Sequence, residues 1–163
     1  MLHASLWQQS GDVTQRLLEH PFVRGLADGT LDRDVFRRYV AQDAFFLRAF
    51  LKAYALAAAK CDDFERARVF HELMTGVLAE LKLHGSYSAT LGIDLGDVEP
   101  YAATTAYTDF LLRVAGDDFG QLCTRLESLL DEIASNSPAV QDAYRYAMQC
   151  ELDFFSAPME NTP

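Results

Sequence analysis

The sequence is poor in several kinds of residue, and each shortage excludes a class of protein. It has three cysteines, at wide spacing, which fits neither a disulfide framework nor a zinc site with paired ligands. No run of about 18 apolar residues, the length of a membrane-spanning helix, occurs. The N-terminus also lacks the basic flank and apolar core of a signal peptide. We therefore expect a cytoplasmic protein that does not associate with a membrane.

Basic side chains are also scarce. The chain has 14 Lys and Arg against 24 Asp and Glu, and its formal net charge is -10. Nucleic acids and anionic membrane surfaces are bound by clustered Lys and Arg, so this charge would repel both. The composition therefore predicts that neither nucleic acid nor membrane is a partner.

The rest of the composition is typical of one globular domain. With 163 residues, of which 50% are hydrophobic, the chain is long enough to bury a core without disulfides or metals. No period-2 strand pattern or internal repeat occurs, and apolar residues recur instead at intervals of three and four. The sequence predicts an all-α helical bundle in which residues 1–163 form a single domain.

Proline, glycine and capping residues indicate where the helices begin and end. The N-terminal half should contain a first helix ending at His20-Pro21, a long buried helix from Asp32 to Lys60, and a second from Asp63 to Gly92 that bends or ends at Gly85. The C-terminal half should contain a helix from a cap at Thr104 to Val114, broken at Gly116, a segment from Phe119 to Ile133, and a helix from Ser137 to about Phe155 with a frayed tail.

One acidic residue, Asp43, lies inside an apolar stretch, RYVAQDAFFLRAF. Helical spacing places Asp43, Phe46 and Phe50 on one face. Two interpretations stay open. Asp43 lies on the solvated side of its helix and the phenylalanines are core, or its carboxylate projects into an aromatic pocket between helices. In such a pocket it could hold a planar, nitrogen-rich ligand while Phe46 packs on the ring.

Glu80 and His84 lie four residues apart in LAELKLHGSYS, a spacing that suits metal ligation as well as a simple side-chain pair. A dimetal site in a helical bundle needs Glu and His from several helices. All four histidines precede residue 85, so the C-terminal half supplies no imidazole. We therefore expect no metal.

Two further residues are candidates for the same pocket. Glu151 lies between aromatic residues in YRYAMQCELDFF. If buried there, it would have a raised pKa and could donate a proton, and if it lies on the polar stripe it is an ordinary exposed glutamate. Tyr107, in AYTDFLL, is a core aromatic residue unless its helix faces Asp43.

Five segments resemble the TenA/THI-4 family in content and order: HPFVRGLADGTLDRDVFRRYVAQDAFFLRAFLKAYALAAAK, AELKLHG, YTDFLL, LLDEIA and YRYAMQCELDFF. The first is the most specific. The resemblance implies a haem-oxygenase-like bundle and an aminopyrimidine aminohydrolase of the thiaminase II type, which acts without a cofactor on a small aminopyrimidine or thiamin. It also implies a homo-oligomer, either a dimer or a tetramer.

The resemblance assigns roles to four residues. Asp43 would hydrogen-bond the aminopyrimidine ring, and Phe46 would be the pocket aromatic that is a tyrosine in many members. Tyr107 would line the same pocket. Glu151 would be the catalytic proton donor that assists departure of the amine.

The family's catalytic cysteine has no counterpart in the expected place. Its helix lies between YTDFLL and the penultimate helix, but here Val114 runs almost directly into Gly116, so about two helices, on the order of 50 residues, are missing. Cys123 lies in a segment that matches a different helix, and its acidic setting does not favour a thiolate.

Three functions follow. The first is a thiaminase II hydrolase whose full-length protein contains the cysteine segment. The second is a non-catalytic pyrimidine-binding member that lacks the nucleophile. The third is a haem-oxygenase-like oxidase, and the lack of histidines in the C-terminal half counts against its dimetal form.

Overall fold

The chain is helical in the part that the structure describes. The computed structural model covers residues 1–163 and describes residues 1–117, 131 and 135–160. These residues form helices joined by turns and short loops, and they contain no strand. The prediction of an all-α protein is therefore confirmed. The expected segment from Phe119 to Ile133, apart from Asp131, lies outside the described residues, as does Cys123.

The chain divides into two compact units, each of which is described by itself. Unit 1 consists of Met1–Asp32 and Gln121–Pro163, and unit 2 consists of Arg33–Gly120. The single domain expected for residues 1–163 stays a prediction.

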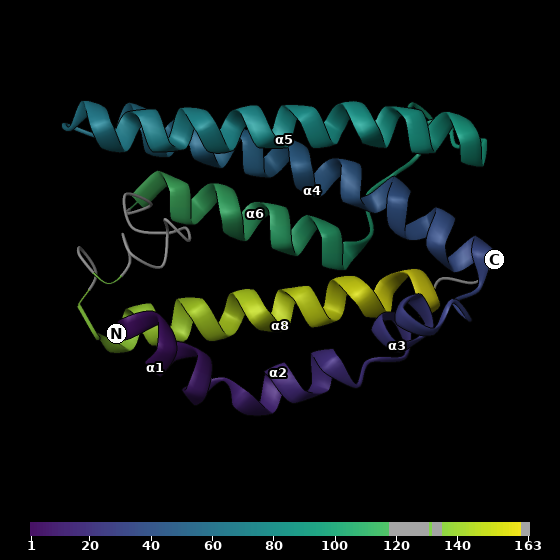
Figure 1. Ribbon diagram of the computed structural model, residues 1–163, viewed down its shortest axis with the longest axis horizontal. Helices are drawn as coiled ribbons and strands as arrows, with labels where there is room; N and C mark the ends of the chain where they lie inside the picture. The colour runs from purple at the N-terminus through teal and green to yellow at the C-terminus, as the bar shows by residue number, and fades with distance from the viewer. Residues whose placement is uncertain (118–130, 132–134, 161–163) are drawn as a thin grey trace. The chain divides into compact units, whose positions relative to one another are not determined.

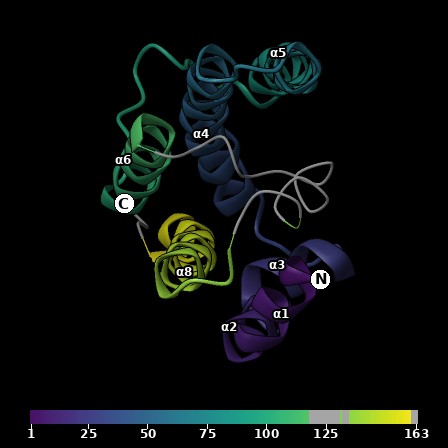
Figure 2. The same cartoon turned by 90° about the vertical axis from the view of Figure 1, so that its left-hand side faces the viewer.

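Unit 2 consists of three helices: α4 (Arg33–Ala59), α5 (Phe64–Leu91) and α6 (Ala102–Asp117). Helix α4 packs against both α5 and α6 (Figures 1 and 2). The two long helices have the bounds that the sequence predicts to within one or two residues. The helix does not end at Gly85, because α5 continues through it, and the bend expected there stays a prediction. The predicted break at Gly116 is wrong, because α6 continues through it. A glycine costs a helix only about 1 kcal/mol, which other interactions along the helix can offset.

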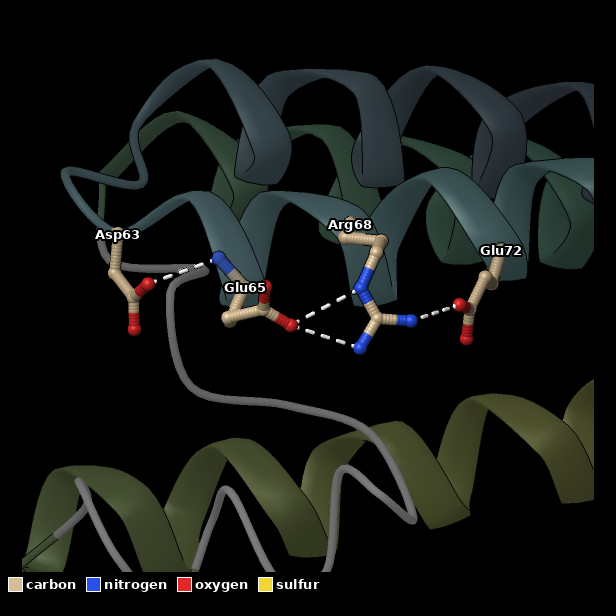
Figure 3. A network of polar contacts seen from close by, with 4 residues as sticks. All are labelled: Asp63, Glu65, Arg68 and Glu72. Carbon is tan, nitrogen blue, oxygen red and sulfur yellow. Dashed lines mark hydrogen bonds and ion pairs between the residues drawn. The ribbon is translucent and has the colours of Figure 1, made fainter.

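Both ends of α5 are explained by local chemistry. A carboxylate oxygen of Asp63 accepts a hydrogen bond from the backbone N–H of Glu65 at 2.9 Å, and Gly92 ends the helix with a left-handed φ of 67°. Arg68 then bridges Glu65 and Glu72 on the surface (Figure 3). These ion pairs are exposed, so they contribute little to stability.

The start of α6 is held by a buried glutamine of α4. The side-chain oxygen of Gln42 accepts hydrogen bonds from the Tyr101 N–H at 2.8 Å and from the Thr104 hydroxyl at 2.7 Å. Its amide donates to the Glu99 carbonyl at 3.0 Å. The predicted cap at Thr104 is therefore wrong. Thr104 lies inside a helix that begins at Ala102, and its hydroxyl bonds to α4 instead.

Unit 1 packs helix α8 (Pro138–Glu160) against three short helices: α1 (Leu2–Gln9), α2 (Gly11–Leu18) and α3 (Pro21–Asp28) (Figure 1). The single first helix expected up to His20 is wrong, because Ser10 separates α1 from α2. The frayed tail is also wrong for residues 156–160, which continue α8.

A histidine caps α3 and joins it to α8. Nδ1 of His20 accepts a hydrogen bond from the Phe22 N–H at 3.2 Å, so the ring hydrogen lies on Nε2. Nε2 donates to the Ser156 hydroxyl oxygen at 3.0 Å, and that hydroxyl donates to the Leu152 carbonyl. Because Pro21 lacks an N–H and follows the cap, the sequence His20-Pro21 ends one helix and starts the next.

Candidate functional site

The candidate site of unit 2 is built around Asp43 on α4. Its side chain is only 14% exposed, so Asp43 does not lie on the solvated side of the helix. Phe46, one turn further along α4, has its ring centroid 4.7 Å from that of Phe50. Helix α4 therefore carries a carboxyl group and an aromatic pair on one face.

Helix α5 supplies a partner for Asp43. Nε2 of His84 lies 2.8 Å from Oδ2 of Asp43, and the His84 side chain is only 7% exposed. Oε1 of Glu80, one turn earlier on α5, lies 3.9 Å from the same nitrogen and is half exposed. The imidazole therefore faces two carboxyl groups from two different helices.

These surroundings change the acidity of Asp43. Burial raises its pKa from 3.8 to about 6 because a charged carboxylate loses its hydration there. The neighbouring His84 lowers the pKa of Asp43, and the negative charge of Glu80 raises it. Asp43 therefore exchanges its proton close to neutral pH, as expected of a carboxyl group with a chemical role.

Helix α6 supplies the third side of the site. Tyr107 is buried, and its ring centroid lies 4.8 Å from that of Phe46 with the rings tilted by 47°. This contact shows that α6 presents Tyr107 to the aromatic face of α4. Gln42, which precedes Asp43, holds the start of α6 and so sets the position of Tyr107.

Two buried polar atoms of α5 lack a hydrogen-bond partner within the described part of the chain. They are Nδ1 of His84 and Oγ of Ser88, one helical turn apart. Buried polar groups in proteins are nearly always paired, so an unpaired one needs an explanation. The two atoms lie on the helix that contacts Asp43, where a ligand or an ordered water could bond to them.

The structure brings together three of the four predicted site residues, Asp43, Phe46 and Tyr107. Glu151 lies on α8 in unit 1, where it is partly buried. Two further residues, Glu80 and His84, were considered above as possible metal ligands. The imidazole of His84 contacts Asp43, and Glu80 lies near the same ring nitrogen. Among the described residues, no group of three or more His, Cys, Asp or Glu side chains could hold a metal ion.

The sequence did not reveal that His84 pairs with Asp43 or that Gln42 anchors α6. Gln42 directly precedes Asp43, and His84 lies in the AELKLHG segment that carries part of the family resemblance. The presence of polar residues within apolar helical segments was the signal that could have marked Gln42 and His84 as site residues. Their partners depend on how α4 faces α5 and α6, which a periodic pattern does not give.

Neither described cysteine has the setting of a nucleophile. Burial raises the pKa of the Cys61 thiol, whose sulfur donates to the Ala57 carbonyl at 3.3 Å. Burial also raises the pKa of Cys150. A reactive cysteine needs a lowered pKa and an accessible, electropositive environment.

None of the described helices combines the length and apolar character needed to cross a bilayer.

The fold defines the class of this chain as an all-α helical protein, and solved TenA structures share that fold. Residues 7–121 match the model of the TENA/THI-4/PQQC family. The chain belongs to that family.

Its relatives include proteins named for an activity. An aminopyrimidine aminohydrolase of Halalkalibacterium halodurans is 32% identical over 150 residues, which are 90% of this chain and 63% of that protein. An aminopyrimidine aminohydrolase of Helicobacter pylori is 34% identical over 111 residues, 66% of this chain and 51% of the relative. The chain therefore spans between half and two thirds of the length of these relatives.

Solved structures show the same fold. A TenA family protein from a Silicibacter species, described as a transcription regulator, matches with a TM-score of 0.87 and 21% identity over 98% of this chain and 97% of its own. A TenA homologue from Pyrococcus furiosus matches with a TM-score of 0.85 and 19% identity over 97% of this chain and 100% of its own. At these identities the likeness establishes the fold alone.

Proposed function

We propose that this protein is a thiamin-salvage hydrolase of the thiaminase II type, which converts an aminopyrimidine or thiamin to hydroxymethylpyrimidine. The observation that carries the proposal is the buried carboxyl group of Asp43, which shares a face of α4 with Phe46, whose ring contacts that of Tyr107. The two relatives named aminopyrimidine aminohydrolase support this substrate class.

The chemistry of an aminopyrimidine suits these side chains. The ring presents an amino group, which donates a hydrogen bond, beside a ring nitrogen, which accepts one. A carboxyl group whose pKa is about 6 can accept from the amino group and, when protonated, donate to the ring nitrogen. Phe46 and Tyr107 would pack against the ring. Asp43 is therefore the ring-binding residue of the proposal.

Hydrolysis also needs an acid. When the substrate is an aminomethylpyrimidine, the hydroxyl of water replaces the amine on the carbon attached to the ring, and the amine must gain a proton to leave as ammonia. We assign Glu151 to this step because the TenA/THI-4 resemblance implies a proton donor at this position, and its side chain is a partly buried carboxyl group.

The proposal also covers the ligand, the cofactor requirement, the location and the assembly of the protein. Its partner is a small aminopyrimidine or thiamin, it uses no cofactor, and it acts in the cytoplasm. The net charge of -10 supports the absence of nucleic acid as a partner. We also propose that the protein assembles as a homo-oligomer, a dimer or a tetramer.

The proposal is tested by ammonia release from aminomethylpyrimidine, with Asp43→Ala and Asp43→Asn as the informative variants. Loss of a hydrogen bond to a charged group costs about 1.5–3 kcal/mol, so both should lower kcat/KM by about 10- to 150-fold. Exposed His71 on α5 offers a control, and His71→Gln should keep full activity. No ammonia from the full-length wild-type protein would contradict the proposal.

Stability separates lost chemistry from misfolding in the Asp43→Asn variant. The pKa of Asp43 is raised by folding, so the free energy of unfolding falls as pH rises from 3.8 to about 6. The asparagine has no charge to bury. This variant should therefore unfold at the same temperature as the wild type or a higher one at pH 7.5, as calorimetry would show.

A second function, a non-catalytic pyrimidine-binding protein, is favoured by the described cysteines. Burial raises the pKa of both Cys61 and Cys150, so neither is activated for covalent catalysis. Titration calorimetry with hydroxymethylpyrimidine distinguishes the two functions. Binding without turnover of aminomethylpyrimidine supports the second function, and failure to bind any pyrimidine contradicts both.

A further inference from the structure

The imidazole of His84 contacts one oxygen of the Asp43 carboxyl group. Its Nε2 lies 2.8 Å from Oδ2 of Asp43, and both side chains are largely buried. The charged groups that act on Asp43 are His84 and Glu80, both from α5. Helix α6 presents Tyr107 to the same face of α4. Burial therefore has the largest effect on the pKa of Asp43, and one imidazole and one further carboxylate adjust it.

The other ring nitrogen indicates where the hydrogen of His84 lies. Nδ1 is buried and has no hydrogen-bond partner among the described residues. The opposite nitrogen, Nε2, lies 2.8 Å from Oδ2 of Asp43, and an ionised carboxylate oxygen only accepts hydrogen bonds, so Nε2 must donate. In the free protein the ring therefore carries its hydrogen on Nε2, beside the carboxyl groups, and keeps Nδ1 as an acceptor.

We propose that His84 is a positioning residue for Asp43, which holds Oδ2 and leaves Oδ1 to the ligand, so that the carboxyl group can gain or lose one proton when an aminopyrimidine binds. The ligand class rests on the function proposed above. The role of His84 in holding Asp43 does not rest on that function, because the contact is present in the free protein.

The oxygen that His84 leaves free can meet either need of an aminopyrimidine. The ring nitrogen of the ligand needs a donor, and its amino group needs an acceptor. When Asp43 takes up a proton, Oδ1 can donate to the ring nitrogen, and when Asp43 loses it, Oδ1 accepts from the amino group. Ser88, one turn from His84, has a buried hydroxyl that also lacks a partner among the described residues.

The first test uses the free wild-type protein. The contact with Asp43 requires the imidazole hydrogen on Nε2. The NMR signals of the His84 ring nitrogens should therefore show a hydrogen on Nε2 that is absent from Nδ1. A hydrogen on Nδ1 instead of Nε2 would overturn the proposal without any variant.

Variants sharpen this test. His84→Gln keeps an N–H donor but cannot titrate, so the pKa of Asp43 should rise when the imidazole that lowers it is removed. Glu80→Gln changes an exposed side chain and should lower the pKa of Asp43, because a negative neighbour is lost. His71 is an exposed histidine of the same helix, and His71→Gln should leave the pKa of Asp43 unchanged. An unchanged Asp43 titration in folded His84→Gln would overturn the proposal.

The ligand test is calorimetry with hydroxymethylpyrimidine in two buffers of different ionisation enthalpy, between pH 5 and pH 8. Binding to the wild type should take up or release a proton to an extent that changes with pH. In His84→Gln this proton exchange should move to higher pH together with the pKa of Asp43, and the Kd should rise about tenfold, the effect of about 1.4 kcal/mol. Identical proton exchange in the two proteins would overturn the role of His84. No binding to the wild type would instead contradict the proposed function, and the NMR titration would still decide the role of His84.

Discussion

The two units of the chain use buried polar side chains differently. In unit 1, His3 pairs with Asp131, and both ring nitrogens of His20 have hydrogen-bond partners. In unit 2, His84 contacts Asp43 through one nitrogen and leaves the other unpaired. Within the described ranges, all three buried side-chain polar atoms without a partner belong to unit 2.

This difference separates a structural from a functional use of the same residue type. His20 caps α3 with one ring nitrogen and bonds to α8 with the other, so it stabilises the fold without leaving a polar atom unpaired. An unpaired buried polar atom costs stability, and proteins keep such atoms mainly where a ligand or a reaction needs them. The polar atoms of unit 2 are therefore the better candidates for chemistry, and those of unit 1 for stability.

The largest effect on stability should come from Gln42→Leu, which tests whether unit 2 also contains purely structural polar groups. Leucine would leave the Thr104 hydroxyl and the Tyr101 N–H without their buried partner, at a cost of at least about 2 kcal/mol. Urea unfolding would measure this loss. The control, Gln9→Leu at an exposed position, should change the free energy of unfolding by less than about 0.5 kcal/mol. Equal effects of the two variants would contradict the anchoring role of Gln42.

A smaller effect, dependent on pH, should come from His20 in unit 1. Burial lowers the pKa of His20 below its usual 6.5, so the unfolded chain takes up a proton first as pH falls. The free energy of unfolding contributed by His20 is therefore present above pH 6.5 and is lost as pH falls below it. Asn at position 20 can cap α3 without titrating, and an N-cap is worth about 1 kcal/mol.

The stability of the wild type relative to His20→Asn should therefore fall between pH 7.5 and pH 5, as measured by urea unfolding at each pH. A constant difference across this range would show that His20 is not kept neutral by the fold.

The smallest effect should come from the surface ion pair between Arg145 and Asp12, which are both exposed. The hydrogen bond from Arg145 lowers the pKa of Asp12 to about 2. Arg145→Gln should return the pKa of Asp12 toward 3.8, as NMR would show, and should leave the melting temperature at pH 7 nearly unchanged. A large fall in melting temperature would mean that this surface pair stabilises the protein more than the capping residue His20 does.

The sequence predicts the long helices of unit 2 well because their ends carry strong local signals. Asp63 and Gly92 act within one turn of the chain, and no other element is needed to explain them. The predictions fail where packing decides. Gly85 does not break α5, and Thr104 bonds across to α4 instead of capping its own helix. The division at Ser10 had a local signal in Ser10-Gly11, but the apolar spacing continues across it.

The same limit applies to the candidate site. Asp43 could be identified because a charge within an apolar run is visible in the sequence. Its pairing with His84 depends on the rotation of two helices about their own axes, and residues so far apart in the chain give no pattern that fixes it. The ring contact of Phe46 with Tyr107 is likewise a product of helix packing.

The central claim is that Asp43 binds the edge of an aminopyrimidine ring. A crystal structure of the full-length protein with hydroxymethylpyrimidine tests it most directly. We predict that the amino group or ring nitrogen of the ligand lies within about 2.7–3.2 Å of Oδ1 of Asp43, with Phe46 and Tyr107 in contact with the ring. A ligand bound elsewhere, with Asp43 and His84 still paired and without contact to the ring, would contradict the claim.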